Sequence, residues 1–127
     1  MRFLPTLIHG VLDYLVGALL IAVPYFVGFD VTGEDAARVA EGVPMVIGGV
    51  TIIYSLGTIY ELGLLRHLPM RIHLWFDGVG GALLASSPFL FGFASEVWVP
   101  HVAVGLFEIV AALVTKTTPS KSARKWD

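Results

Sequence analysis

The stretch Arg2–Phe29, RFLPTLIHGVLDYLVGALLIAVPYFVGF, occurs a second time in the chain as Arg66–Phe93, RHLPMRIHLWFDGVGGALLASSPFLFGF. The two copies align without a gap at an offset of 64 residues, and 13 of their 28 positions are identical. Repetition on this scale indicates that the chain builds one structural unit twice.

The composition around these copies is typical of a membrane protein. Of the 127 residues, 56% are hydrophobic and 14% are charged, and the mean hydropathy is +0.80. Four apolar runs approach or exceed the roughly 20 residues that cross a hydrocarbon core of ~30 Å, and they cover about Thr6–Phe29, Gly42–Tyr60, Ile72–Phe93 and Val97–Thr115. Because a backbone in lipid must satisfy its own hydrogen bonds, we expect helices. The prediction is an all-α, polytopic membrane four-helix bundle.

Two helices per copy divide the chain into two parallel repeats within a single transmembrane domain, 1–127. Repeat 1 covers about 2–62, repeat 2 covers about 66–116, and 117–127 forms a short basic tail. The second run is expected to start at Pro44, which pairs with Pro100 at an offset of 56, as Gly49 pairs with Gly105. Pro24 and Pro88 each remove a backbone hydrogen bond near the end of a first helix, which predicts a bend there.

The basic residues predict the orientation in the cell membrane. Seven of the eight lie before the first run, between the second and third, or after the fourth: Arg2, Arg66, Arg71, Lys116, Lys121, Arg124 and Lys125. Lys and Arg accumulate on the cytoplasmic side of membrane proteins. We therefore expect a multi-pass protein with both termini cytoplasmic.

Positions 9, 13, 17, 20, 24 and 28 have identical counterparts in the second copy, and their spacings of three and four residues trace one stripe along a helix. We expect the first helices of the two repeats to contact each other, or the pseudo-twofold axis between them, through this stripe.

The ends of the two copies resemble the SPW-repeat family of membrane proteins, which is named for a Ser-Pro-Trp signature in the first of two transmembrane helices per repeat. Ser87-Pro88-Phe89 matches that signature with Phe in place of Trp, and Val23-Pro24-Tyr25 departs further. The resemblance implies the architecture of two two-helix repeats and carries no activity with it.

Ionisable residues within apolar runs are costly and point to function by default. His9 and Asp13 lie one helical turn apart in the first run, and His73 and Asp77 repeat this pattern in the third. Glu108 lies in the fourth run. The sequence predicts that these five groups gather in the cytoplasmic half of the bundle, whereas His101 is expected at the outer membrane interface.

Several interpretations of this set stay open. The His/Asp pairs act as interhelical hydrogen bonds in a structural role, or as a proton or ion pathway, since histidine titrates near neutral pH. A divalent metal such as Zn, Mn or Fe is a lesser alternative, with His9, Asp13, His73 and Asp77 as candidate ligands. A bis-histidine haem between His9 and His73 is weaker still. No metal or other cofactor is assigned.

The favoured interpretation is a small structural or assembly-type integral membrane protein whose biochemical activity stays open, with a proton-linked channel or transporter as the alternative. Nucleotide-binding, nucleophile-elbow and zinc-protease motifs are missing, so an enzyme is not predicted. The expected partner is the lipid bilayer, with no nucleic acid and no known small-molecule substrate. Rows of small residues in the third run also predict self-association, or packing within the chain: Gly78, Ala82 and Ser86, and Gly81 and Ala85.

Overall fold

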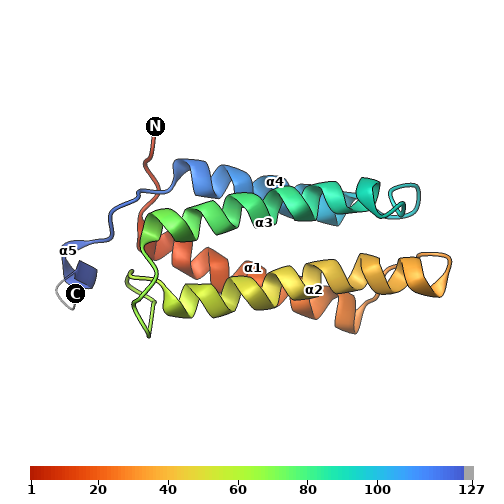
Figure 1. Cartoon of the computed structure of the whole chain (residues 1–127), viewed down its shortest axis with the longest axis horizontal. Coiled ribbons are helices and arrows are strands. Elements are labelled where there is room, and N and C mark those ends of the chain that lie inside the picture. Colours follow the sequence, from red (N-terminus) through yellow and green to blue (C-terminus); the bar gives the residue numbers. More distant parts are fainter. Residues whose placement is uncertain (125–127) are drawn as a thin grey trace.

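The computed structural model describes residues 1–124, which form four long helices and one short one (Figure 1). The helices are α1 (Thr6–Phe26), α2 (Glu34–Gly57), α3 (Met70–Leu90), α4 (Val99–Val114) and α5 (Lys121–Arg124). Helix α5 lies in the predicted basic tail, 117–127, of which residues 125–127, including Lys125, fall outside the described residues. The all-α class and the four-helix bundle are confirmed.

The two repeats run in the same direction. Helices α1 and α3 point one way along the bundle and α2 and α4 return, so the N-terminus, the α2–α3 connection and α5 gather at one end (Figure 1). Near this end Leu4 pairs with Thr115, and Leu68 pairs with Thr58. Leu68 is the counterpart of Leu4 at the repeat offset of 64, so the two pairings are equivalent. In each repeat, the segment just before the first helix pairs with the end of the second helix of the other repeat.

Within each repeat the two helices meet at a pair of glycines. A Cβ on Gly48 would lie 2.5 Å from the carbonyl oxygen of Gly17, and a Cβ on Gly105 would lie 2.5 Å from that of Gly81. Glycine allows this backbone approach because it has no side chain. Since Gly17 and Gly81 are equivalent, Gly48 corresponds to Gly105 at an offset of 57. The expected pairing of Gly49 with Gly105 is therefore wrong by one residue.

Helix α2 starts earlier than the apolar pattern indicates. It begins at Glu34 rather than near Gly42, and Pro44 lies inside it. Glu34 and Asp35 occupy its first turn, where negative side chains interact favourably with the helix dipole. The predicted start at Pro44 is therefore wrong. The turns before Pro44 are helical because their acidic residues stabilise the helix N-terminus, and they were missed because they are too polar to belong to an apolar run.

Pro44 also changes the surroundings of His101. Proline has no N–H to donate to the carbonyl four residues earlier, which here belongs to Ala40. The His101 ring donates to that oxygen instead, through Nε2 at 2.7 Å, and His101 is 2% exposed. His101 is therefore packed inside the bundle in the first turn of α4, while its position at the outer membrane interface stays a prediction.

Pro24 and Pro88 lie two residues before the ends of α1 and α3. Gly28 and Gly92 follow with φ angles of 72° and 79°, a left-handed conformation that glycine adopts without steric cost. The matching prolines and glycines thus end the two helices alike, while the predicted bends stay a prediction.

The surface of the bundle is apolar and its interior is unusually polar. Large hydrophobic side chains such as Leu15, Trp75 and Leu113 are exposed, whereas the buried set includes three histidines, two aspartates and a glutamate. By length and composition α1 and α2 are each able to cross a membrane, and α4 is a shorter apolar helix of 16 residues. This distribution fits a lipid surround better than water.

Candidate functional site: a buried histidine–aspartate quartet

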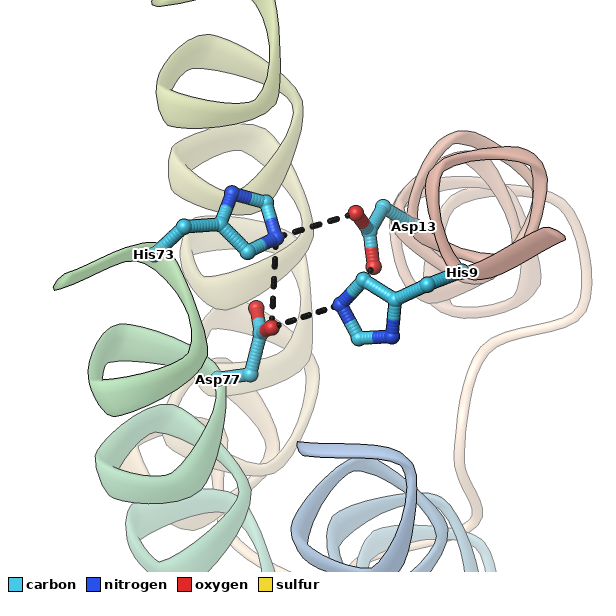
Figure 2. A group of neighbouring side chains, drawn as sticks. All are labelled: His9, Asp13, His73 and Asp77. Carbon is cyan, nitrogen blue, oxygen red and sulfur yellow. Dashed lines mark hydrogen bonds and ion pairs between the residues drawn. The ribbon is translucent and has the colours of Figure 1, made fainter. Parts of the chain in front are cut away.

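Four of the five predicted polar residues meet inside the bundle, in the first turns of α1 and α3. His9 and Asp13 on α1 face His73 and Asp77 on α3, and we call these four residues the quartet (Figure 2). His9 Nε2 lies 3.2 Å from Asp13 Oδ1 and 2.9 Å from Asp77 Oδ2. His73 Nε2 lies 3.1 Å from Asp13 Oδ2 and 3.2 Å from Asp77 Oδ2. Each histidine therefore contacts the aspartates of both repeats.

The helical spacing explains why the quartet converges. The predicted stripe is buried along α1 at His9, Asp13, Gly17, Leu20 and Pro24, and the equivalent positions of α3 are buried as well. Residues four apart lie on the same side of a helix. Two such helices running in the same direction across a pseudo-twofold axis bring their His/Asp pairs to the same level.

Two threonines orient the histidine rings from behind. His9 Nδ1 lies 2.9 Å from Thr115 Oγ1, and His73 Nδ1 lies 2.7 Å from Thr58 Oγ1. The hydroxyls of Thr115 and Thr58 donate their protons to carbonyls one turn earlier, at 2.6 and 2.7 Å. Since a hydroxyl has one proton, each threonine oxygen accepts from the imidazole. Both rings therefore carry a proton on Nδ1 and direct Nε2 toward the carboxylates.

Sequence reasoning missed these threonines. Thr58 and Thr115 follow the last residues of α2 and α4 and lie 57 positions apart, as Gly48 and Gly105 do. A comparison of the second helices at this offset would have found them. The offset of 56, which aligns two prolines, conceals the match.

Helix α2 also contributes polar groups to the aspartates. The Tyr54 hydroxyl donates to Asp77 Oδ1, and the Ser55 hydroxyl lies 3.5 Å from Asp13 Oδ2. The equivalent residues of α4, 57 positions on, are Ala111 and Ala112. The residues around the quartet are thus less symmetric than the quartet itself.

Glu108, the fifth candidate, is 5% exposed on α4. In residues 1–124 no hydrogen bond or ion pair joins it to the quartet, and its Cβ lies against Gly81 at the helix crossing. It is a neighbour of the site rather than a member. The quartet itself is closed, because the exposed fraction of its side chains does not exceed 2%.

Glu61 connects the predicted cytoplasmic end of the bundle to the tail. Its carboxylate accepts hydrogen bonds from the Thr6 hydroxyl at 2.7 Å and from the Ser120 backbone N–H at 3.0 Å. Partial burial acts to raise the pKa of Glu61, but these hydrogen bonds outweigh it and lower the pKa below its ordinary value.

Comparison with known proteins assigns a family and no activity. No curated protein matches the chain, and no solved structure matches it. The model of the SPW repeat domain matches residues 7–115, which include the whole quartet and all four long helices apart from Thr6, the first residue of α1. With its apolar helices and its repeated Pro-x-x-x-Gly-Phe helix ends, the chain belongs to the SPW repeat family of membrane proteins.

Proposed function

We propose that this chain is a structural or assembly-type membrane module, in which the quartet joins the two repeats into one bundle. The observation that supports this role is the contact of each histidine with an aspartate of its own repeat and of the other. The glycine crossings join helices only within a repeat. The quartet thus supplies the polar contacts between α1 and α3.

The surroundings make these contacts energetically important. A charged or strongly polar side chain inside the hydrocarbon region is costly without a partner, and removing one member of a buried ion pair costs about 3–5 kcal/mol. A single hydrogen bond between membrane helices contributes only ~0.6 kcal/mol on average. Separating the repeats would leave four polar groups unpaired in the hydrocarbon region, and this cost, more than the energy of each hydrogen bond, would hold the repeats together.

Thermal unfolding of the purified full chain in detergent tests this role. Asp77→Ala removes a carboxylate that both histidines contact, so we expect the free energy of unfolding to fall by about 3–5 kcal/mol. Asp77→Asn keeps an oxygen acceptor and should lose less. Glu108→Gln is the matched control, because it neutralises a buried carboxylate outside the quartet. Equal losses for Asp77→Ala and Glu108→Gln would contradict the proposal.

A proton-linked channel or transporter is the second candidate. It draws support from Tyr54, which contacts Asp77 and also lines a surface groove of about 440 Å³ between α2 and α3. In liposomes this function requires a proton flux that Asp13→Asn with Asp77→Asn abolishes while the fold is retained. Such a flux would replace the structural proposal.

For the arrangement in the membrane, we propose four transmembrane helices with both termini and the α2–α3 connection in the cytoplasm. The positions of the basic residues support this orientation. The chain has no cysteine, so Gly33→Cys and Ser122→Cys each introduce a single label. We expect the two cysteines to react with an impermeant reagent from opposite sides of the membrane. Labelling from the same side would contradict the topology.

We further propose that the module self-associates through one of its two rows of small residues. Gly81 and Ala85 are occupied by the crossing with Gly105. Ala82 is exposed, and Gly78 and Ser86 are partly exposed. A Cβ on Gly78 would contact nothing within 4 Å. This second row therefore offers a second copy a close helix approach.

A further inference from the structure

We infer that the quartet binds one divalent metal ion, with Zn²⁺ as the best match, through His9 Nε2, His73 Nε2 and one oxygen each of Asp13 and Asp77. This inference builds on the proposed role of the quartet as the joint between the repeats, and it names the ligand of that joint. One donor atom from each of the four residues can be chosen so that all lie within 4.8 Å of one another.

The first argument is the orientation of the histidines. Metal-bound histidines usually donate the N–H of the second ring nitrogen to a fixed acceptor, which sets the tautomer and the ring direction. Thr115 and Thr58 are such acceptors, because their hydroxyl protons are already given to backbone carbonyls. Both Nε2 atoms are thereby aimed at the carboxylates in advance (Figure 2).

The second argument is an unpaired atom. His73 Nε2 is buried and lies 3.1 Å from Asp13 and 3.2 Å from Asp77, yet it makes no hydrogen bond of acceptable geometry to either. Buried polar groups without a partner are rare and call for an explanation. The nitrogen points between the two carboxylates, and a cation at that position would contact all three groups.

The third argument is the size of the site. Zinc is usually bound tetrahedrally in structural sites, with bonds of about 2.0–2.2 Å to nitrogen and oxygen, so its ligand atoms lie roughly 3.3–3.6 Å apart. With Asp77 Oδ2 and Asp13 Oδ2 as the oxygen ligands, three nitrogen–oxygen separations are 2.9, 3.1 and 3.2 Å, whereas His9 Nε2 lies 3.2 Å from the other oxygen of Asp13, Oδ1. An outward movement of a few tenths of an ångström per pair would bring these separations to coordination distance.

Charge is balanced in the bound form. Two ionised carboxylates and two neutral imidazoles carry two negative charges, which one divalent cation cancels within the low-dielectric interior. Any proton held on Nε2 leaves to solvent as the metal–nitrogen bond forms. Two nitrogen and two oxygen donors without thiolate suit zinc, while divalent manganese and iron bind a given site of this kind more weakly. Because the protein supplies all four ligands, the site is structural and has no open coordination position.

The residues behind the ligands complete the site. Tyr54 donates to the Asp77 oxygen that faces away from His9 and His73, which leaves Oδ2 for the metal. Such hydrogen bonds to ligating carboxylates orient them. The exposed His67, in the α2–α3 connection, has no comparable surroundings and provides a control.

The test uses the full chain in detergent, stripped with a chelator, loaded with Zn²⁺ and desalted before metal analysis. We expect about one zinc per chain, a visible absorption spectrum of tetrahedral type with Co²⁺, and loss of both in His9→Gln with His73→Gln. His67→Gln should bind like the natural chain. Folded protein that retains only traces of zinc, or zinc that persists in the double variant, would overturn the inference.

A second variant keeps the test decisive if the double variant does not fold. Thr58→Val leaves all four ligands in place and removes only the partner of His73 Nδ1, so we expect zinc affinity to fall about 10–100-fold. An unchanged affinity would also count against the site. If zinc does not bind but Asp77→Ala still lowers thermal stability, the metal inference fails and the structural role stands. If zinc binds but Asp77→Ala leaves the metal-free stability unchanged, the structural role fails instead.

Discussion

The neighbouring glycines Gly48 and Gly49 provide the sharpest test of how α1 and α2 pack. A Cβ added to Gly48 would lie 2.5 Å from the carbonyl oxygen of Gly17 and 2.9 Å from the Cβ of Leu20. Neither neighbour can rotate away, because one is backbone and the other is the first side-chain atom. A Cβ added to Gly49 would meet nothing within 4 Å. The two positions thus lie side by side on one helix, but only Gly48 faces a neighbouring helix.

The expected magnitude follows from two opposing effects. Overpacking costs typically 1–3 kcal/mol, while Gly→Ala inside a helix gains up to about 1 kcal/mol of helix propensity. The gain applies to both positions and cancels when they are compared. We therefore expect Gly48→Ala to be less stable than Gly49→Ala by about 1–3 kcal/mol, and Gly49→Ala to be neutral or slightly stabilising.

Equilibrium unfolding in mixed micelles, followed by circular dichroism, measures this difference. The same pair of variants also distinguishes the two possible alignments of the repeats. An offset of 56 makes Gly49 the counterpart of Gly105, whereas the structure makes Gly48 the counterpart. Equal stabilities, or greater loss in Gly49→Ala, would refute the packing described here.

Three further predictions concern other parts of the bundle. Thr58→Val and Thr115→Val should each cost about 1–3 kcal/mol in thermal unfolding, because each leaves a buried imidazole N–H without an acceptor, and a loss at one threonine alone would contradict the pseudo-symmetry. The pKa of Glu61 is lowered in the folded chain, so its contribution to stability is present above its unfolded value near 4.5 and is lost as the pH falls through the folded pKa. We expect proteolysis of the tail near Ser120 to increase at acid pH in the natural chain and Glu61→Gln to remove this pH dependence. An unchanged pH profile in Glu61→Gln would exclude a role of Glu61 in holding the tail. Ala82→Leu should shift sedimentation in density-matched detergent toward the monomer, since a large side chain blocks close approach of helices, and an unchanged oligomer would exclude this face.

The repeated stretch predicted a large part of this structure. Identical residues at an offset of 64 indicated two equivalent helices, and the spacing of three and four along positions 9 to 24 identified their buried face. From the same stripe, His9, Asp13, His73 and Asp77 were expected to gather. These predictions succeeded because helical periodicity is a local property, and a side chain's direction around a helix follows from its position in the sequence.

The second helices show where sequence alone was insufficient. Their two copies are too different for the offset to be found by identity, so the alignment followed the prolines Pro44 and Pro100 rather than the glycines at the crossings. The acidic first turns of α2 were missed when its start was placed at Pro44, since an apolar pattern cannot identify a helix that extends beyond the hydrophobic run.

Tertiary structure alone decided which groups become partners across the bundle. Each histidine meets the aspartate of the other repeat, Thr115 orients His9 over a separation of 106 residues, and His101 takes the carbonyl that Pro44 leaves free. The sequence determined the helices, their apolar surface and the faces they bury. It could not determine these pairings, because a hydrogen bond depends on distances of a few tenths of an ångström, and those distances are set only when four helices pack together.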